Sequence, residues 1–325
     1  VVRRVSQGKR VVDVEDAAEN MPGLGLPRVR INPRVGIIPV NYGCLGSCAY
    51  CCVRFARGRL RSYGAEEIVD RVERDVSEGV REFWLTSQDT ACYGRDLGSS
   101  LAELIESVCS VDGDFFVRVG MMTPNNLSSI LEETVKAFQC DKVFKFLHLP
   151  VQSGDDEVLG RMNRQYTVEN FVAVVERFRK AFPRLTFATD VIVGFPGETE
   201  REFSRTWELV EEVRPDVTNV SKYFARPGTP ARGLGGLVSP AEVKERSARV
   251  ASLARRVSFE CNRGWLGWGG RGLVDEVGRR GSVVGRNSAY KPIVIRGLGG
   301  RGLLGEFVDV RVVGAFQSYL LGEIS

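Results

Sequence analysis

Apolar and polar positions follow two different repeats along most of this chain. Short apolar runs rich in β-branched and aromatic residues alternate with longer stretches in which apolar residues recur every three or four positions. Such patterns are typical of buried strands and of amphipathic helices, respectively. The predicted strands are Val35–Val40, Glu82–Thr86, Phe115–Val119, Val143–Leu149, Leu185–Val193 and Val217–Tyr223. The predicted helices are Ala65–Glu78, Leu101–Ser110, Leu127–Phe138, Val168–Phe182 and Glu200–Val213.

This alternation predicts an α/β fold in which helices cover a parallel sheet. The strands are almost continuously apolar, as expected of strands that are buried on both faces. The six β/α units are too few for a closed eight-stranded barrel. We therefore expect an open, partial (β/α)6 barrel.

The pattern changes at both ends of the predicted barrel, which we place at residues 34–238. Residues 1–33 are polar and predict a linker or the remnant of a preceding domain, with a strand-like piece at Arg10–Val14. Residues 239–263 predict a connecting helix. Residues 264–325 contain short strands separated by glycines, which predicts a small all-β barrel.

Polar or glycine-rich segments come directly after the predicted strands. They are Cys44–Cys51, Ser87–Thr90, Thr123–Asn125, Gln152–Gly154, Gly194–Thr199 and Arg226–Pro230. In β/α barrels the loops at the carboxyl ends of the strands build the active site. Each segment taken singly is also explained as an ordinary turn or helix cap. Their common position nevertheless predicts one functional rim.

The first rim segment contains three cysteines, Cys44, Cys48 and Cys51, with the spacing C-x3-C-x2-C. Three thiolates can hold a [4Fe–4S] cluster and leave its fourth iron open, which is the arrangement that reductive cleavage of S-adenosylmethionine requires. A structural zinc site is the alternative, but it needs four ligands, and the single histidine, His148, lies in an apolar run. A disulfide framework is disfavoured because nothing in the chain indicates secretion.

Composition limits the remaining possibilities. The 325 residues are 43% hydrophobic and 26% charged, which suits one large and one small soluble domain. Eight cysteines without a signal peptide predict reduced thiols in the cytoplasm. No apolar run approaches the roughly 18 residues needed to span a membrane, so no membrane partner is expected. The oligomeric state is not indicated.

Basic and aromatic residues in the small barrel predict contacts with RNA. Arg286 and Lys291 would bind phosphates, and Tyr290 would be an exposed aromatic on which a base stacks. The alternative is a solvated basic face, because the net charge of the chain is only +4.

Four sequence segments make the chain resemble the methylthiotransferase branch of the radical S-adenosylmethionine enzymes. They are Cys51–Tyr63, Trp84–Asp96, Leu147–Gly154 and Ala188–Thr199. Within that branch the chain is most similar to the archaeal and eukaryotic enzymes that modify N6-threonylcarbamoyladenosine in tRNA, and its small barrel resembles the RNA-binding TRAM domain. The resemblance extends over roughly residues 25–323.

The resemblance implies a radical-SAM barrel that adds a methylthio group to C2 of the adenine ring, with tRNA and an electron donor as partners. Cys44, Cys48 and Cys51 would hold one [4Fe–4S] cluster. The residues expected to contact S-adenosylmethionine are Ser87, Gln88, Gln152, Ser153, Asp190 and Gly194, with Arg164 as a further possibility. We expect His148 to be a packed barrel histidine and not a catalyst, because it lies in an apolar strand.

One feature of the family is missing. Its members carry an N-terminal domain whose three cysteines hold a second [4Fe–4S] cluster, and no cysteine precedes Cys44 in this sequence. The chain therefore resembles a methylthiotransferase without its first domain. Two other functions remain open. One is a radical enzyme that acts on another substrate, such as a ribosomal-protein aspartate or isopentenyl-adenosine. The other is an RNA-binding protein with a structural cluster and no sulfur insertion.

Overall fold

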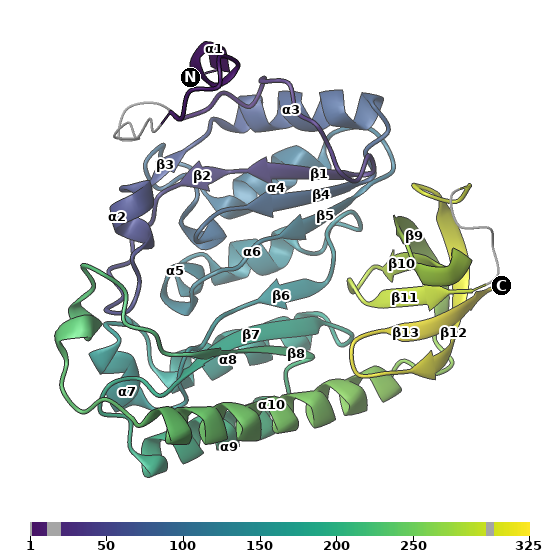
Figure 1. The fold of residues 1–325 in the computed structure, drawn as a ribbon. Helices are drawn as coiled ribbons and strands as arrows, with labels where there is room; N and C mark the ends of the chain where they lie inside the picture. The colour runs from purple at the N-terminus through teal and green to yellow at the C-terminus, as the bar shows by residue number, and fades with distance from the viewer. Residues whose placement is uncertain (1, 12–20, 297–301) are drawn as a thin grey trace.

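The larger part of the molecule is an open half-barrel of six parallel strands with helices on its outer face (Figure 1). The computed structural model describes residues 2–11, 21–296 and 302–325. Strands β1 (Val35–Pro39), β4 (Glu82–Thr86) and β5 (Phe116–Val119) form one sheet, and β6 (Phe146–His148), β7 (Thr186–Val193) and β8 (Val217–Lys222) form another. A parallel bridge between Val117 and Val143 joins the two sheets. Strands β1 and β8 do not pair among the described residues, so the predicted open barrel is confirmed.

Each strand is followed by at least one helix, as the sequence predicts. The helices are α2 (Val53–Arg57), α3 (Ala65–Ser77), α4 (Leu101–Cys109), α5 (Pro124–Ser128), α6 (Leu131–Ala137), α7 (Asp156–Arg161), α8 (Val168–Ala181) and α9 (Glu200–Val213). Capping boxes begin α4, α8 and α9, where a serine or threonine accepts from the third helical residue. These caps explain why the starts of the three helices can be located from sequence alone.

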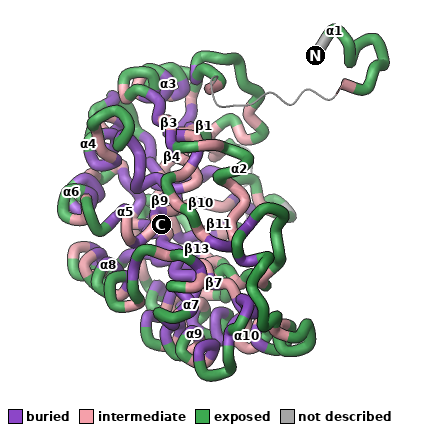
Figure 2. The backbone as a smooth tube through the Cα atoms, turned by 90° about the vertical axis from the view of Figure 1, so that its left-hand side faces the viewer, coloured by how far each residue is buried: buried purple, intermediate pink, exposed green. Residues whose placement is uncertain are grey.

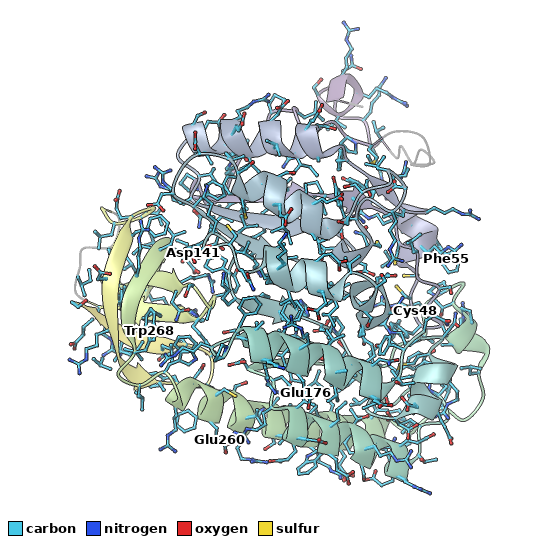
Figure 3. All side chains as sticks on the ribbon, turned by 180° about the vertical axis from the view of Figure 1, so that it is seen from behind. Cys48, Phe55, Asp141, Glu176, Glu260 and Trp268 are labelled. Carbon is cyan, nitrogen blue, oxygen red and sulfur yellow. The ribbon has the colours of Figure 1, made fainter. Side chains whose placement is uncertain are left out.

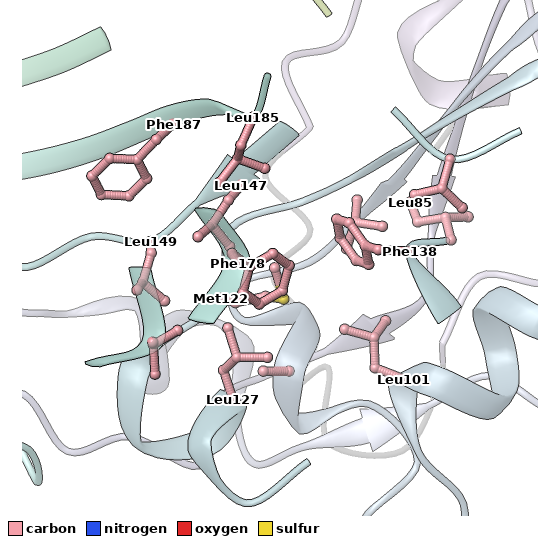
Figure 4. Packing of buried hydrophobic residues seen from close by; sticks show 14 of the residues in the cluster. Leu85, Leu101, Met122, Leu127, Phe138, Leu147, Leu149, Phe178, Leu185 and Phe187 are labelled. Carbon is pink, nitrogen blue, oxygen red and sulfur yellow. The ribbon is translucent and has the colours of Figure 1, made fainter. Parts of the chain in front are cut away.

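The core lies between the strands and the helices, and exposed residues cover the outside of the helices (Figure 2). Phe138 after α6 and Phe178 of α8 meet edge to face with ring centroids 5.3 Å apart. Leu85 of β4 and Leu147 of β6 pack against the same cluster (Figure 4). These side chains are almost completely buried, which fixes the helices on the sheet through apolar contact.

The structure corrects several local expectations. The predicted helix Leu127–Phe138 is two helices, α5 and α6, because the chain turns at Ser129 and Ile130. Only Phe146–His148 of the predicted strand Val143–Leu149 is a strand. The sequence did not predict α7 or the short hairpin of β2 (Asn41–Tyr42) and β3 (Arg61–Ser62), which brackets the cysteine segment. Most of the strand-like piece at Arg10–Val14 lies outside the described residues, while a short helix, α1 (Val2–Val5), is seen before it.

A long helix, α10 (Pro240–Arg263), leads to a closed five-stranded β-barrel. Its strands are β9 (Gly269–Val277), β10 (Val283–Asn287), β11 (Pro292–Ile295), β12 (Phe307–Ala315) and β13 (Leu320–Ile324), in the order β10-β11-β13-β12-β9. The sequence did not predict β13, which closes the barrel by pairing with β11 and β12. The barrel has its own core, which includes Trp265, Val274 and Val310.

The small barrel packs at the amino ends of the half-barrel strands. The ring centroids of Phe116 in β5 and Phe307 in β12 lie 5.5 Å apart, and the Lys145 amide donates to the Ser288 carbonyl at 2.7 Å. The cysteine segment follows the carboxyl end of β1, and Cys48 and Trp268 accordingly lie at opposite ends of the molecule (Figure 3). The concave face of the six strands thus lies between the cysteines and the small barrel. The space along this face, which holds cavities of about 410 and 250 Å³, is called the lumen below.

Candidate functional site

The three predicted cluster ligands share one short loop at the carboxyl edge of the half-barrel. This segment, Cys44–Cys51, is called the Cys loop below. Cys44, Cys48 and Cys51 are half-buried and line one cavity of about 150 Å³. That volume is far larger than the roughly 10–15 Å³ that holds a single water. The Gly46 amide lies 3.2 Å from the Cys44 sulfur, and a Cβ at Gly46 would lie 3.3 Å from the same atom.

The donor set fits an iron–sulfur cluster better than it fits one ion. No three histidine, cysteine or acidic side chains converge on a single metal ion anywhere in the described ranges. A cube differs, because each of its ligating sulfurs belongs to a different iron and the sulfurs stand further apart. Burial raises the pKa of the Cys44 and Cys51 thiols. A bound metal deprotonates such thiols outright.

Arg164, which follows α7, is a positive group beside the Cys loop. Its Nη1 donates to the Cys48 sulfur at 3.1 Å, and its Nε donates to the Tyr166 hydroxyl at 2.9 Å. Burial alone would lower the pKa of Arg164, but Tyr166, Tyr50 and Cys48 together raise it. The guanidinium therefore stays charged and gives the Cys48 sulfur a fixed hydrogen-bond donor.

Asp89 organises the neighbouring part of the rim and was not singled out by the sequence analysis. Its carboxylate accepts from the Thr123 amide and hydroxyl, from the Asn126 side chain and from the Ala91 amide. Asp89 also lines a cavity of about 200 Å³ together with Cys44 and Cys48. The rim segments after β4 and β5 are thereby held next to the Cys loop.

A row of polar side chains from three strands crosses the lumen. His148 Nε2 of β6 lies 3.0 Å from Asp190 Oδ1 of β7, and the Asn219 amide of β8 donates to the same oxygen at 2.7 Å. Burial alone would raise the pKa of Asp190, but these hydrogen bonds hold it below its usual value. His148 is therefore not simply a packed core histidine, because its side chain is 16% exposed and bonds to a lumen carboxylate.

The predicted cofactor contacts occupy two kinds of position. Gln152 and Asp190 line a cavity of about 410 Å³ that reaches Tyr50 of the Cys loop. Ser153 is fully buried, and its hydroxyl lies 3.3 Å from the Thr206 hydroxyl. Gly194 has φ 75°, and a Cβ there would lie 2.4 Å from Val243 Cγ2 of α10. Packing alone thus accounts for Ser153 and Gly194.

The other two predicted contacts follow β4. The Ser87 hydroxyl accepts from the Asp89 amide at 3.1 Å. Gln88 Oε1 is buried and has no hydrogen-bond partner among the described residues. Such an oxygen is expected to receive a donor from a bound molecule or water.

The structure places the three predicted RNA contacts of the small barrel against the half-barrel instead of in solvent. Lys291 is 4% exposed, and its ammonium donates to Asp216 at 2.6 Å and to Asn262 at 2.7 Å. Arg286 pairs with Asp275 at 2.8 Å. Tyr290 is not the exposed aromatic that the sequence predicted, because its ring centroid lies 4.8 Å from that of Phe144 and 5.1 Å from that of Phe146. The contacts of Lys291 and Tyr290 join the two parts of the molecule, whereas Arg286 and Asp275 both belong to the small barrel.

No helix in the described part of the chain is both long enough and apolar enough to cross a membrane.

Comparison with known proteins agrees with this geometry. The Radical SAM superfamily matches residues 38–210, and the TRAM domain matches residues 273–325. A probable threonylcarbamoyladenosine tRNA methylthiotransferase of Pyrococcus horikoshii is 43% identical over 99% of this chain and 75% of the relative. A threonylcarbamoyladenosine tRNA methylthiotransferase of Drosophila melanogaster is 41% identical over 93% of this chain and 54% of the relative.

A solved structure supports the fold. The radical S-adenosylmethionine methyltransferase TsrM from Kitasatospora setae, with cobalamin and a [4Fe-4S] cluster bound, superposes with a TM-score of 0.51 at 19% identity, over 61% of this chain and 38% of that protein. The half-barrel, the Cys loop and the two matched regions lead to one conclusion. The chain belongs to the Radical SAM superfamily and, within it, to the threonylcarbamoyladenosine tRNA methylthiotransferase family.

Proposed function

We propose that this chain adds a methylthio group to C2 of N6-threonylcarbamoyladenosine in tRNA. The observation that carries the proposal is the position of three cysteines on one loop, at the carboxyl edge of a half-barrel whose lumen holds a cavity of about 410 Å³. The family membership supports the tRNA substrate. We also propose that residues 34–238 form the radical-SAM half-barrel, residues 239–263 a connecting helix and residues 264–325 an RNA-binding β-barrel.

The side chains of the chain would hold and orient the cofactors. Cys44, Cys48 and Cys51 would bind one [4Fe–4S] cluster, and Gln152 and Asp190 would contact S-adenosylmethionine in the adjoining cavity. When bound, the cluster and S-adenosylmethionine supply the reductive cleavage and the hydrogen abstraction that activate C2 of the adenine. Arg164 would orient Cys48 by donating to its sulfur, and the Asp89 network would hold the rim segments in place.

Exposed arginines of the small barrel are better suited to tRNA phosphates than Arg286 and Lys291. Arg279, Arg296 and Arg311 are exposed, and no carboxylate pairs with them in the part of the chain that the structure describes. Each lost phosphate contact lowers the slope of log affinity against log salt by about 0.7–0.9. We expect Arg279→Ala and Arg311→Ala to lower this slope, and Arg286→Ala to leave it nearly unchanged.

Full methylthiolation needs a source of sulfur, whereas cleavage of S-adenosylmethionine alone does not. The five cysteines outside the Cys-loop triad, Cys52, Cys92, Cys109, Cys140 and Cys261, do not repeat the spacing of that triad. This observation favours a second candidate, in which the chain cleaves S-adenosylmethionine but inserts sulfur poorly without a further donor.

The test is anaerobic reconstitution with iron and sulfide, followed by incubation with S-adenosylmethionine, a reductant and tRNA. We expect about four irons per chain, release of deoxyadenosine, and a mass increase of the target nucleoside. Replacing the three cysteines of the Cys loop by alanine should remove the iron, whereas a Cys109→Ala, Cys140→Ala, Cys261→Ala protein should retain it. Iron retained by the first protein would refute the site. Deoxyadenosine without any change in tRNA would favour the second candidate.

A further inference from the structure

At the end of the lumen nearest the small barrel, aromatic rings surround the Arg118 guanidinium, and Arg286, already paired with Asp275, lies on the Tyr290 ring as well. Arg118 of β5 lies beside Trp84 of β4, with which it is in register. Its Cζ lies 5.5 Å from the Trp84 ring centroid, 4.9 Å from that of Phe146 and 5.3 Å from that of Tyr290. These four residues are called the lumen floor below. Contacts between a guanidinium and aromatic faces at these distances are favourable and restrict the orientation of the planar group.

Arg118 is a cation without a carboxylate partner among the described residues. Its Nε is buried and donates to no acceptor within the same part of the chain. The carboxylates nearby are already bound: Asp216 to Lys291, Asp275 to Arg286, and Asp190 to His148. The remaining one, Glu82, has its pKa raised to about 7 by burial and by Asp275, which reduces its negative charge. The lumen floor therefore carries an uncompensated positive charge.

The backbone of Tyr290 adopts an unusual conformation that places its ring in the lumen floor. Its φ is 63°, a left-handed value that is strained for a residue with a Cβ. The Asn287 side chain holds this turn by accepting from the Ala289 and Lys291 amides. The small barrel thus contributes one wall to a site in the half-barrel, and strain of this kind is common at ligand-binding positions.

The lumen floor lies at the end of the lumen that a substituent of the base would reach. Three of its residues, Arg118, Phe146 and Tyr290, line a cavity of about 250 Å³ that also includes His148 and Asn219. Asn219 lines the 410 Å³ cavity near the Cys loop as well, so the two cavities meet at this residue. An adenine whose C2 faces the Cys loop directs its N6 substituent away from that loop. In N6-threonylcarbamoyladenosine this substituent carries the free carboxylate and hydroxyl of threonine.

We propose that Arg118 binds the carboxylate of the threonylcarbamoyl group, with the lumen floor as its recognition site. The inference rests on the proposed function, since that function supplies the substrate. An arginine fork matches a carboxylate with two parallel hydrogen bonds, and a partly buried site makes such a pair stronger than in water. The site would discriminate modified from unmodified adenosine before any chemistry occurs.

The test measures binding of three anticodon stem–loops to the reconstituted full chain without reductant. The stem–loops carry threonylcarbamoyladenosine, its threonine methyl ester, or plain adenosine at the same position. Loss of a hydrogen-bonded charge pair corresponds to about 10- to 100-fold in affinity. We expect the wild-type protein to bind the ester and the plain stem–loop more weakly by about this factor. Arg118→Met should bind all three stem–loops about equally, and Arg118→Lys should show intermediate discrimination.

Arg177→Met is the matched control, because Arg177 lies on the outer helix α8 and pairs with Glu132. It should behave as the wild type does. The proposal is overturned if Arg118→Met still distinguishes the ester from the free acid, or if the wild type does not distinguish them. Equal weakening of all three stem–loops by Arg118→Met would also overturn it, by indicating a phosphate contact or a structural role. The methylthiolation assay on the wild type decides the proposed function independently.

Discussion

The buried carboxyl pair between the half-barrel and the small barrel should make stability depend on pH. Glu82 of β4 is fully buried against Asp275 of β9, and the Trp84 indole donates to its other oxygen. Burial, and secondly Asp275, raise the pKa of Glu82 from 4.5 to about 7. The pKa of Asp275 is raised as well, again by burial. The two carboxyl groups are compatible at close range only when they share a proton.

The sign and size of the effect follow from this pKa shift. The folded state binds the Glu82 proton more tightly than the unfolded state, so this group destabilises the fold progressively as pH rises from about 4.5 to about 7. Each pKa unit corresponds to about 1.36 kcal/mol, which gives a penalty on the order of 3 kcal/mol above pH 7. Glu82→Gln removes the titrating group and can still accept from Trp84. It should therefore be more stable than the wild type by about 1–3 kcal/mol at pH 8, and about equal to it near pH 4.5.

Urea unfolding followed by tryptophan fluorescence at pH 5, 6.5 and 8 would measure the difference. Glu132→Gln is the control, because Glu132 forms an exposed ion pair with Arg177 and should show no gain at pH 8. A gain for Glu82→Gln that is constant across this range would refute the shared proton, because it would come from something other than titration. A loss of stability at pH 8 would show that the carboxylate is charged and paired in the folded state.

Two further substitutions test how the parts of the molecule are joined. Lys291→Met should destabilise by about 3 kcal/mol in urea unfolding, because it leaves the nearly buried Asp216 without its cation; an unchanged midpoint would show that the pair contributes nothing. Gly194→Ala should destabilise by about 1–3 kcal/mol, since its φ is 75° and its Cβ would lie 2.4 Å from Val243 Cγ2. The double variant with Val243→Ala should recover part of that loss, and no recovery would mean that backbone strain alone is responsible.

The sequence alone determined the features that depend on neighbouring residues. Apolar runs and periodic stretches located the six parallel strands and the helices α3, α4, α8 and α9 to within a few residues, because both patterns are local. Thr199 and Glu202 mark the start of α9 for the same reason. The Cys loop was identified from spacing, since three ligands within eight residues need no distant partner to meet. The short helix α7 and the closing strand β13 were missed because each has only five or six residues and a weak pattern.

The tertiary structure decided which polar residues face the lumen and which join the two barrels. Arg286, Tyr290 and Lys291 resemble a nucleic-acid surface in sequence, but the partners that bury Tyr290 and Lys291 come from remote segments such as Phe144 and Asp216. His148, Asp190 and Asn219 form one hydrogen-bonded row only because β6, β7 and β8 lie side by side. A side chain brings its ionisable group to any fold, whereas its charge and its role depend on burial and on which distant groups lie beside it after folding. Arg118 has no such group among the described residues, and only the folded chain reveals this.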